Sequence, residues 1–274
     1  MITNSKVIVI TSGKGGVGKT TTAAAIGSQI AKEGHKTVII DFDIGLRNLD
    51  LIMGCERRVV YDFINVINNE SLLFQALIQD KREKNLFILA ASQTSNKECL
   101  NKKSVGNILE KLKEKFEYII CDSPAGIEKG ALVALYFADE AIIVTNPEIS
   151  SVRDSDRIIG LIDSCSLKAE NNLEMKKSLL ITRYEDKRVK KGEMLSVEDV
   201  KEILAIPLLG IIPESHLILN SSNNGVPVTL TKNISEVYIS YVNASNKILG
   251  KEQIEYKNQD NWAKKILSRF GFDQ

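Results

Sequence analysis

The sequence has few cysteines, and their arrangement suits neither a metal centre nor a disulfide framework. The four residues are Cys55, Cys99, Cys121 and Cys165, and they form no C-x-x-C pair. This spacing argues against an iron–sulfur cluster, a zinc site or a small disulfide-bonded secreted domain. We therefore expect reduced, mostly buried thiols in a cytosolic protein.

Long apolar runs and an excess of charge are also missing. Residues 1–6 lack the apolar core of a signal peptide, and no uninterrupted apolar stretch approaches the roughly 18 residues of a spanning helix. The 274 residues include 36 Lys and Arg against 35 Asp and Glu, so no global field attracts nucleic acid or membrane. Either kind of binding would require a local patch, and we expect no specific nucleic-acid partner.

A glycine-rich stretch at residues 13–20 stands out near the start of the chain, directly after the apolar run at 7–10. It fits the dinucleotide pattern G-x-G-x-x-G and also the phosphate-loop pattern G-x-x-x-x-G-K-[ST]. Only the second pattern needs an ammonium group for the β and γ phosphates and a hydroxyl for Mg²⁺, and Lys19 and Thr20 provide both. We therefore predict a phosphate loop whose nucleotide contacts come from Gly13, Lys14, Gly15, Gly16, Val17, Gly18, Lys19, Thr20 and Thr21.

Apolar strands alternate with helical patterns over most of the chain. Helices are expected at 20–33, closed by Gly34, and at 234–249, closed by Gly250. Near-continuous apolar strands form parallel sheets that are covered by helices on both faces. The sequence thus predicts a doubly wound, mainly parallel α/β domain over residues 1–249, with its ligand at the carboxyl ends of the strands. Strands are expected at 7–10, 37–43, 86–89, 118–121, 141–144, 178–181 and 208–212.

Carboxylates follow two of these expected strands. Asp41 and Asp43 close the strand at 37–43, and Asp122 follows the strand at 118–121. An aspartate there either caps a helix or turn, or orients a metal beside a phosphate loop. The loop favours the metal role for Asp122, whereas Asp41 fits a metal site and the ribose contact of a dinucleotide fold equally. Asp43 is a candidate for orienting the attacking water.

Lys14 is a second lysine in the loop, although one bound nucleotide already has Lys19. One interpretation is a solvated side chain at a variable position. The other is a side chain that points away from its own site and reaches the phosphates of a second subunit, as an arginine finger does. In the second case the dimer would depend on ATP.

Residues 14–21, KGGVGKTT, resemble the deviant phosphate loop of the bacterial family of chromosome-partitioning and septum-placing ATPases. The stretches 41–54, 122–126 and 151–157 resemble the septum-placing members, and the similarity covers nearly the whole chain. The resemblance implies a Mg²⁺-dependent enzyme that converts ATP to ADP and phosphate and forms a homodimer when ATP is bound.

The same resemblance implies roles for individual residues. Lys14 would be the signature lysine that acts across the dimer, and Lys19 with Thr20 would contact the phosphates and Mg²⁺. Asp43 would orient water in the first switch region, and Asp122 would be the metal-associated aspartate of the second. Adenine recognition would come from residues near the ends of later strands, namely Arg183 and Pro213 with Glu214.

The segment 150–165 carries a helix-start pattern, with Ser151 able to cap and Asp154 three residues further on. Its charged residues either only start the helix or also bind a partner protein. The resemblance implies that Arg153, Asp154 and Asp156 dock the division inhibitor MinC and the regulator MinE.

The end of the chain carries an independent signal. Residues 250–260 are charged and poor in core formers, which predicts a linker. In a helix over 261–270 the apolar and basic residues would lie on opposite faces, with no acid on the polar face. Such a helix either packs on the domain or lies in an anionic bilayer interface, as the linker and the cationic face favour. The apolar residues include Trp262, Ile266, Leu267 and Phe270, and the basic ones are Lys264, Lys265 and Arg269.

Three basic residues contribute about 1 kcal/mol each at an anionic surface, so a monomer would bind weakly. Two helices on one dimer raise avidity by roughly 10²–10⁴. We therefore expect a cytoplasmic, peripheral protein of the inner membrane whose attachment follows ATP. The resemblance adds septum placement through recruitment of a division inhibitor. The alternative is a partitioning ATPase that binds DNA non-specifically, which would need a basic stripe on the domain.

Overall fold

The computed structural model describes residues 5–95 and 99–256. Its centre is an eight-stranded sheet with the order β3-β4-β2-β5-β1-β6-β7-β8. Only β3 pairs antiparallel, with β4, and every other pair of neighbours is parallel. The strands are β1 (Lys6–Thr11), β2 (Thr37–Asp41), β3 (Leu77–Gln79), β4 (Leu86–Leu89), β5 (Tyr118–Asp122), β6 (Glu140–Thr145), β7 (Lys176–Tyr184) and β8 (Leu208–Pro213).

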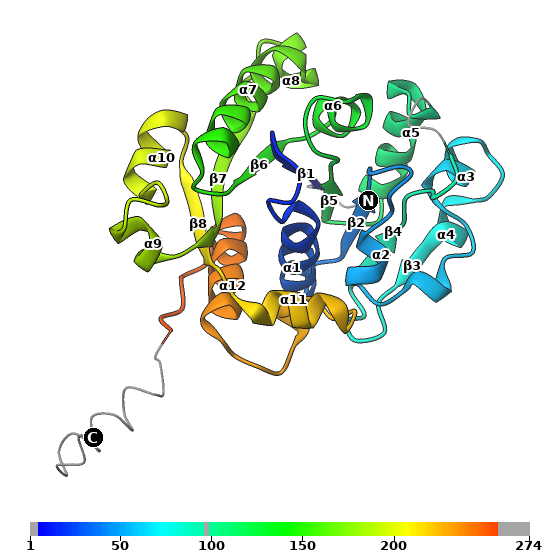
Figure 1. The fold of residues 1–274 in the computed structure, drawn as a ribbon. Helices are drawn as coiled ribbons and strands as arrows, with labels where there is room; N and C mark the ends of the chain where they lie inside the picture. The colour runs from blue at the N-terminus through cyan, green and yellow to red at the C-terminus, as the bar shows by residue number, and fades with distance from the viewer. Residues whose placement is uncertain (1–4, 96–98, 257–274) are drawn as a thin grey trace.

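Helices cover both faces of the sheet (Figure 1). One layer holds α1 (Lys19–Lys32), α11 (His216–Asn223) and α12 (Glu236–Leu249), and the other holds α5 (Lys102–Lys113), α6 (Lys129–Tyr136), α7 (Ile149–Cys165) and α10 (Val197–Leu204). The shorter helices are α2 (Leu49–Ile52), α3 (Phe63–Ile67), α4 (Leu73–Ala76), α8 (Leu167–Glu170), α9 (Asp186–Lys190) and the 3-10 turns Glu56–Arg58 and Val228–Leu230. The predicted doubly wound, mainly parallel fold is confirmed.

All seven expected strands are present, and their bounds differ from the predicted ones by up to three residues. The strand predicted at 37–43 ends at Asp41, because the chain turns away there and Asp43 lies in a loop. The antiparallel strand β3 was not predicted, since three residues directly after α4 give no period of their own. The last predicted helix begins at Glu236 and ends at Leu249, with Gly250 in the left-handed conformation as its cap.

The alanine-rich helix α1 packs closely on the middle of the sheet. Three of its residues, Ala23, Ala24 and Ala25, are fully buried in the core. A methyl group on Gly27 would lie 2.7 Å from the side chain of Ile39 in β2. These small residues therefore hold the phosphate loop, which precedes α1, against the carboxyl ends of the strands.

The strand order brings three parts of the predicted site together. β1, which carries the loop, lies beside β5, and Ile10 is in register with Asp122. β2 lies on the other side of β5, where Asp41 is in register with Asp122. In the part of the chain described, no helix is long and apolar enough to cross a membrane.

Candidate functional site

The phosphate loop occupies the turn between β1 and α1. Gly16 and Gly18 have φ angles of 77° and 95°, which only glycine adopts without strain. Gly18 is the N-cap of α1 and provides no side-chain cap, so the first N–H groups of the helix stay available for phosphate oxygens. A cavity of about 500 Å³ opens over them. Its lining includes the predicted residues Gly15, Gly16, Gly18, Lys19, Thr20, Thr21, Asp43 and Arg183.

Lys19 lies at the floor of this cavity and is 8% exposed. Its Nζ donates to the Ser12 hydroxyl at 2.9 Å, and that hydroxyl donates to the Lys14 carbonyl at 2.7 Å. Burial lowers the pKa of Lys19, while the negative charges of Asp122 and Asp43 act in the opposite direction. The ammonium group is therefore desolvated but held by the loop, ready for a phosphate. Ser12 was missed from sequence, although its place between β1 and the loop was a usable signal.

Asp122 closes β5 and is 1% exposed. Burial raises the pKa of Asp122 well above its usual range, and the negative charge of Asp41 adds to this, whereas a hydrogen bond from Thr20 and the charge of Lys19 lower it. One carboxylate oxygen, Oδ1, is buried and has no hydrogen-bond partner among the described residues.

An unpartnered carboxylate oxygen beside the Thr20 hydroxyl fits a Mg²⁺ ion. Both are oxygen ligands, and Mg²⁺ takes one or two protein ligands together with phosphate and water. The described residues contain no group of three His, Cys, Asp or Glu that could hold a metal ion. Thr20 and Asp122 would therefore hold the ion, which would neutralise phosphate charge.

Asp41 is fully buried and anchors the loop that carries Asp43. One of its carboxylate oxygens accepts from the Asp43 N–H at 2.8 Å and the other from the Leu49 N–H at 3.3 Å. Burial raises the pKa of Asp41 to about 7, and the two backbone N–H groups act in the opposite direction. The geometry gives Asp41 a positioning role, and its predicted metal role stays a prediction. Asp43 lines the cavity, as a water-orienting residue must.

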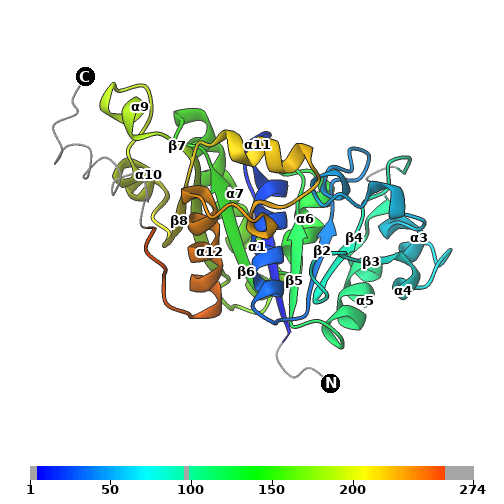
Figure 2. The ribbon, with the colours of Figure 1, turned by 90° about the horizontal axis from the view of Figure 1, so that it is seen from below.

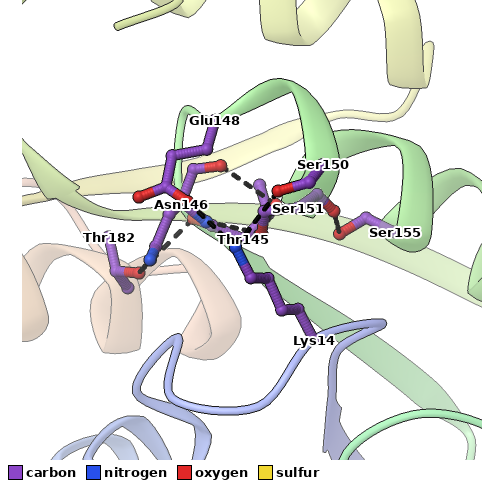
Figure 3. A network of polar contacts seen from close by, with 8 residues as sticks. All are labelled: Lys14, Thr145, Asn146, Glu148, Ser150, Ser151, Ser155 and Thr182. Atoms are coloured by element: carbon purple, nitrogen blue, oxygen red, sulfur yellow. Dashed lines mark hydrogen bonds and ion pairs between the residues drawn. The ribbon is translucent and has the colours of Figure 1, made fainter.

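The Lys14 side chain reaches from the phosphate loop toward the start of α7 (Figure 3). Its Nζ lies 3.0 Å from the Glu148 carboxylate and 3.1 Å from the Ser150 hydroxyl, at the start of α7. Lys14 is therefore not among the residues that line the cavity.

The helix cap predicted at Ser151 is wrong. α7 begins at Ile149 after Glu148, so Ser151 lies inside its first turn. The Ser151 hydroxyl is fully buried, 2.9 Å from the Thr145 hydroxyl, and accepts from the Asn146 N–H at 3.2 Å (Figure 3). Ser151 ties α7 to the end of β6 because the preceding residues already begin the helix.

Two further residues that were not predicted lie beside the loop: Thr182 of β7 contacts it, and Asn146, directly after β6, contacts Thr182. The Thr182 hydroxyl lies 2.7 Å from the Val17 carbonyl and 2.9 Å from the side-chain oxygen of Asn146. Of the adenine candidates, Arg183 lines the cavity and has a φ of 55°, whereas Pro213, the last residue of β8, does not line it. Their contact with adenine stays a prediction.

The predicted docking residues lie on α7 with different exposure. Arg153 and Asp156 are exposed, and Asp154 is partly buried because its backbone packs against the phosphate loop. The helix is thus in direct contact with Gly13. The predicted membrane segment 261–270 lies outside the described residues.

A Gly13→Ala substitution is expected to destabilise the protein by about 2–3 kcal/mol, as overpacking does. The added methyl group would lie 2.2 Å from the carbonyl carbon and oxygen of Asp154, both backbone atoms. Gly160→Ala, in the same helix, has no atom within 4 Å and is expected to gain about 1 kcal/mol. Urea unfolding measures the free energy of unfolding of both variants. Equal stability of Gly13→Ala and wild type would contradict the close contact.

Comparison with known proteins agrees with this geometry. The family described as "CobQ/CobB/MinD/ParA nucleotide binding domain" matches residues 8–228. The septum site-determining protein MinD of Escherichia coli (strain K12) is 60% identical over 251 residues, which cover 91% of this chain and 93% of that protein.

Two solved structures show the same fold. A MinC:MinD cell division protein complex from Aquifex aeolicus is 41% identical, covers 93% of this chain and 99% of the other, and has a TM-score of 0.81. The septum site-determining protein MinD of Pyrococcus horikoshii, complexed with Mg-ADP, is 26% identical. The match covers 89% of this chain and 96% of that one, with a TM-score of 0.78. The chain therefore belongs to the MinD septum site-determining proteins of the CobQ/CobB/MinD/ParA nucleotide-binding family.

Proposed function

We propose that this chain hydrolyses ATP, dimerises when ATP is bound, and thereby attaches to the cytoplasmic face of the inner membrane, where it recruits a division inhibitor that places the septum. The observation that carries this proposal is that the two lysine side chains of the phosphate loop lie in different places. Lys19 lies buried at the phosphate position, while Lys14 turns out of its own cavity toward α7. Of these two lysines, Lys14 is the one outside its own cavity, which supports a contact with a nucleotide on another subunit.

Hydrolysis rests on four groups around the cavity. Lys19 holds the β and γ phosphate oxygens, and Thr20 with Asp122 would hold Mg²⁺. Asp43 orients the attacking water, because its loop is fixed by the two backbone hydrogen bonds to Asp41. Lys14, supplied by the partner subunit, would stabilise the charge that develops on the transferred phosphate. The Mg-ADP bound to the Pyrococcus horikoshii relative supports an adenine nucleotide and Mg²⁺ at this site.

Co-sedimentation with anionic vesicles tests the proposal directly. With ATP and Mg²⁺ the protein is expected to pellet with vesicles and release phosphate, whereas with ADP it should stay in the supernatant. Equal sedimentation with both nucleotides would refute control by ATP. Retention on DNA in place of vesicles would favour the partitioning function.

The division inhibitor MinC and the regulator MinE are proposed to dock on α7. A relative from Aquifex aeolicus has been solved as a MinC:MinD complex, and here α7 exposes Arg153 and Asp156 beside the nucleotide loop.

Removing the acids of this surface is expected to weaken partner binding. Asp154→Ala and Asp156→Ala should each lower the affinity for MinC or MinE about two- to fivefold, which is the range of an exposed ion pair. Isothermal titration calorimetry with the ATP-bound protein measures the affinity. Glu110→Ala is the control, because it removes an exposed acid from α5. Unchanged constants for both partners in both variants would refute docking on α7.

A further inference from the structure

Residues 251–256, which we call the strap, do not leave the domain after α12. At Gly250 the chain reverses, and the Lys251 N–H donates to the Asn246 carbonyl at 2.8 Å. The Lys251 ammonium group lies 2.6 Å from the Glu33 carboxylate, directly after the end of α1. This reversal takes place at the edge of the sheet opposite the phosphate loop, because α1 begins at the loop and runs to Lys32.

Two asparagines of α12 then hold the strap along the helix. The Asn246 side chain donates to the Glu252 carbonyl at 2.9 Å. The Asn243 carboxamide accepts from the Ile254 N–H at 2.7 Å and donates to the Ile254 carbonyl at 2.9 Å. One side chain thus satisfies both backbone groups of Ile254, as a residue on a neighbouring antiparallel strand would.

The order of these contacts gives the direction of the strap. Glu252 pairs near the end of α12, and Ile254 pairs one turn earlier in the helix. The strap therefore runs antiparallel to α12, back toward the edge that carries the nucleotide site, and Figure 2 shows it turning up along the outer side of the helix. From sequence this stretch was expected to be part of a linker over 250–260.

We infer that the strap is a fixed part of the domain that carries the chain back toward the nucleotide edge. Of the linker predicted over 250–260, only the four residues 257–260 then separate the strap from the predicted membrane segment, and we call these four residues the tether. The tether part of this inference rests on the proposed membrane attachment, whereas the strap itself does not. Effective concentration falls roughly with the −3/2 power of tether length. Releasing the strap would lengthen the tether from four residues to ten and lower dimer avidity about fourfold.

Hydrogen–deuterium exchange tests the strap in the full-length protein. Asn243→Ala removes both bonds to Ile254, and Ile254→Pro removes the N–H from the strap without changing α12. For Asn243→Ala the Ile254 amide is expected to exchange about tenfold faster, as loss of a net-stabilising hydrogen bond allows. In Ile254→Pro the neighbouring strap amides should accelerate. Asn233→Ala is the matched control, because Asn233 is an exposed asparagine that precedes α12 in the chain.

Vesicles of equal parts phosphatidylcholine and phosphatidylglycerol, with ATP, test the tether. Both strap variants act on Ile254 and leave the Asn246–Glu252 bond in place, so the tether grows from four residues to eight. Binding should therefore be about threefold weaker than for wild type and Asn233→Ala. An Ile254 amide that already exchanges at the unprotected rate in wild type would overturn the strap. Faster exchange with unchanged vesicle binding would overturn the tether. If wild type itself binds no vesicles, the proposed function fails, and the exchange data still decide the strap.

Discussion

A Lys14→Ala variant is expected to bind ATP as tightly as wild type, yet to stay monomeric with ATP and to turn over about 10³-fold more slowly, the lower end of what a residue supplied in trans contributes. Nucleotide affinity should survive because Lys19, Thr20 and the loop backbone are unchanged. Dimerisation should fail because Lys14 is the loop side chain that lies outside its own cavity.

Loss of stability would not explain such a result. The Lys14 and Glu148 side chains are 40% and 45% exposed, so their ion pair contributes below about 1 kcal/mol. Glu148→Gln is the matched control, because it weakens the same contact within the chain and leaves Lys14 in place. Size-exclusion chromatography with light scattering measures the dimer, and phosphate release measures turnover. A stable ATP dimer of Lys14→Ala would refute the role of this lysine across the interface.

A Leu267→Glu variant is expected to lose co-sedimentation with anionic vesicles while keeping its affinity for ATP. Removing one leucine from an apolar face costs about 1.5–3 kcal/mol, so a dimer with two segments loses roughly 3–6 kcal/mol, or about 10²–10⁴ in affinity. That loss is as large as the whole gain in avidity expected from dimerisation.

Ser268→Glu separates loss of the apolar face from added charge. It places the same carboxylate one residue further on, on the predicted polar face. The added negative charge should weaken the electrostatic attraction of each segment to the vesicle by about 1 kcal/mol. ATP-dependent binding should therefore be weaker but still measurable. If Leu267→Glu still sediments with vesicles like wild type, the membrane segment has been assigned to the wrong residues.

Sequence patterns predicted the fold and the nucleotide loop because both depend on short-range regularity. Continuous apolar strands identified every parallel strand, and the spacing of Gly13, Gly18 and Lys19 identified the loop. The carboxylates of Asp41 and Asp122 were predicted to lie near the site because the carboxyl ends of neighbouring parallel strands meet at one edge, although the predicted strand bounds were off by one or two residues.

Contacts between distant segments were not predictable in this way. Thr182 contacts the loop at Val17, more than a hundred residues away, and Asn146 contacts Thr182, yet neither belongs to a local motif. Ser151 looked like a helix cap, but the preceding residues begin α7 and leave its hydroxyl in the core. The two asparagines that hold the strap look like ordinary polar positions of an amphipathic helix until the chain is seen to turn back.

Gly13 and α7 pack against each other with no space between their backbones. The backbone of Asp154 lies so close that a methyl group has no room, so the start of the loop cannot shift toward the helix without displacing it. With 17 residues, α7 is a rod about 25 Å long, and a rigid rod displaced at one end moves at the other. A rearrangement of the loop around a nucleotide would therefore reach the far surface of the domain as a tilt of one helix.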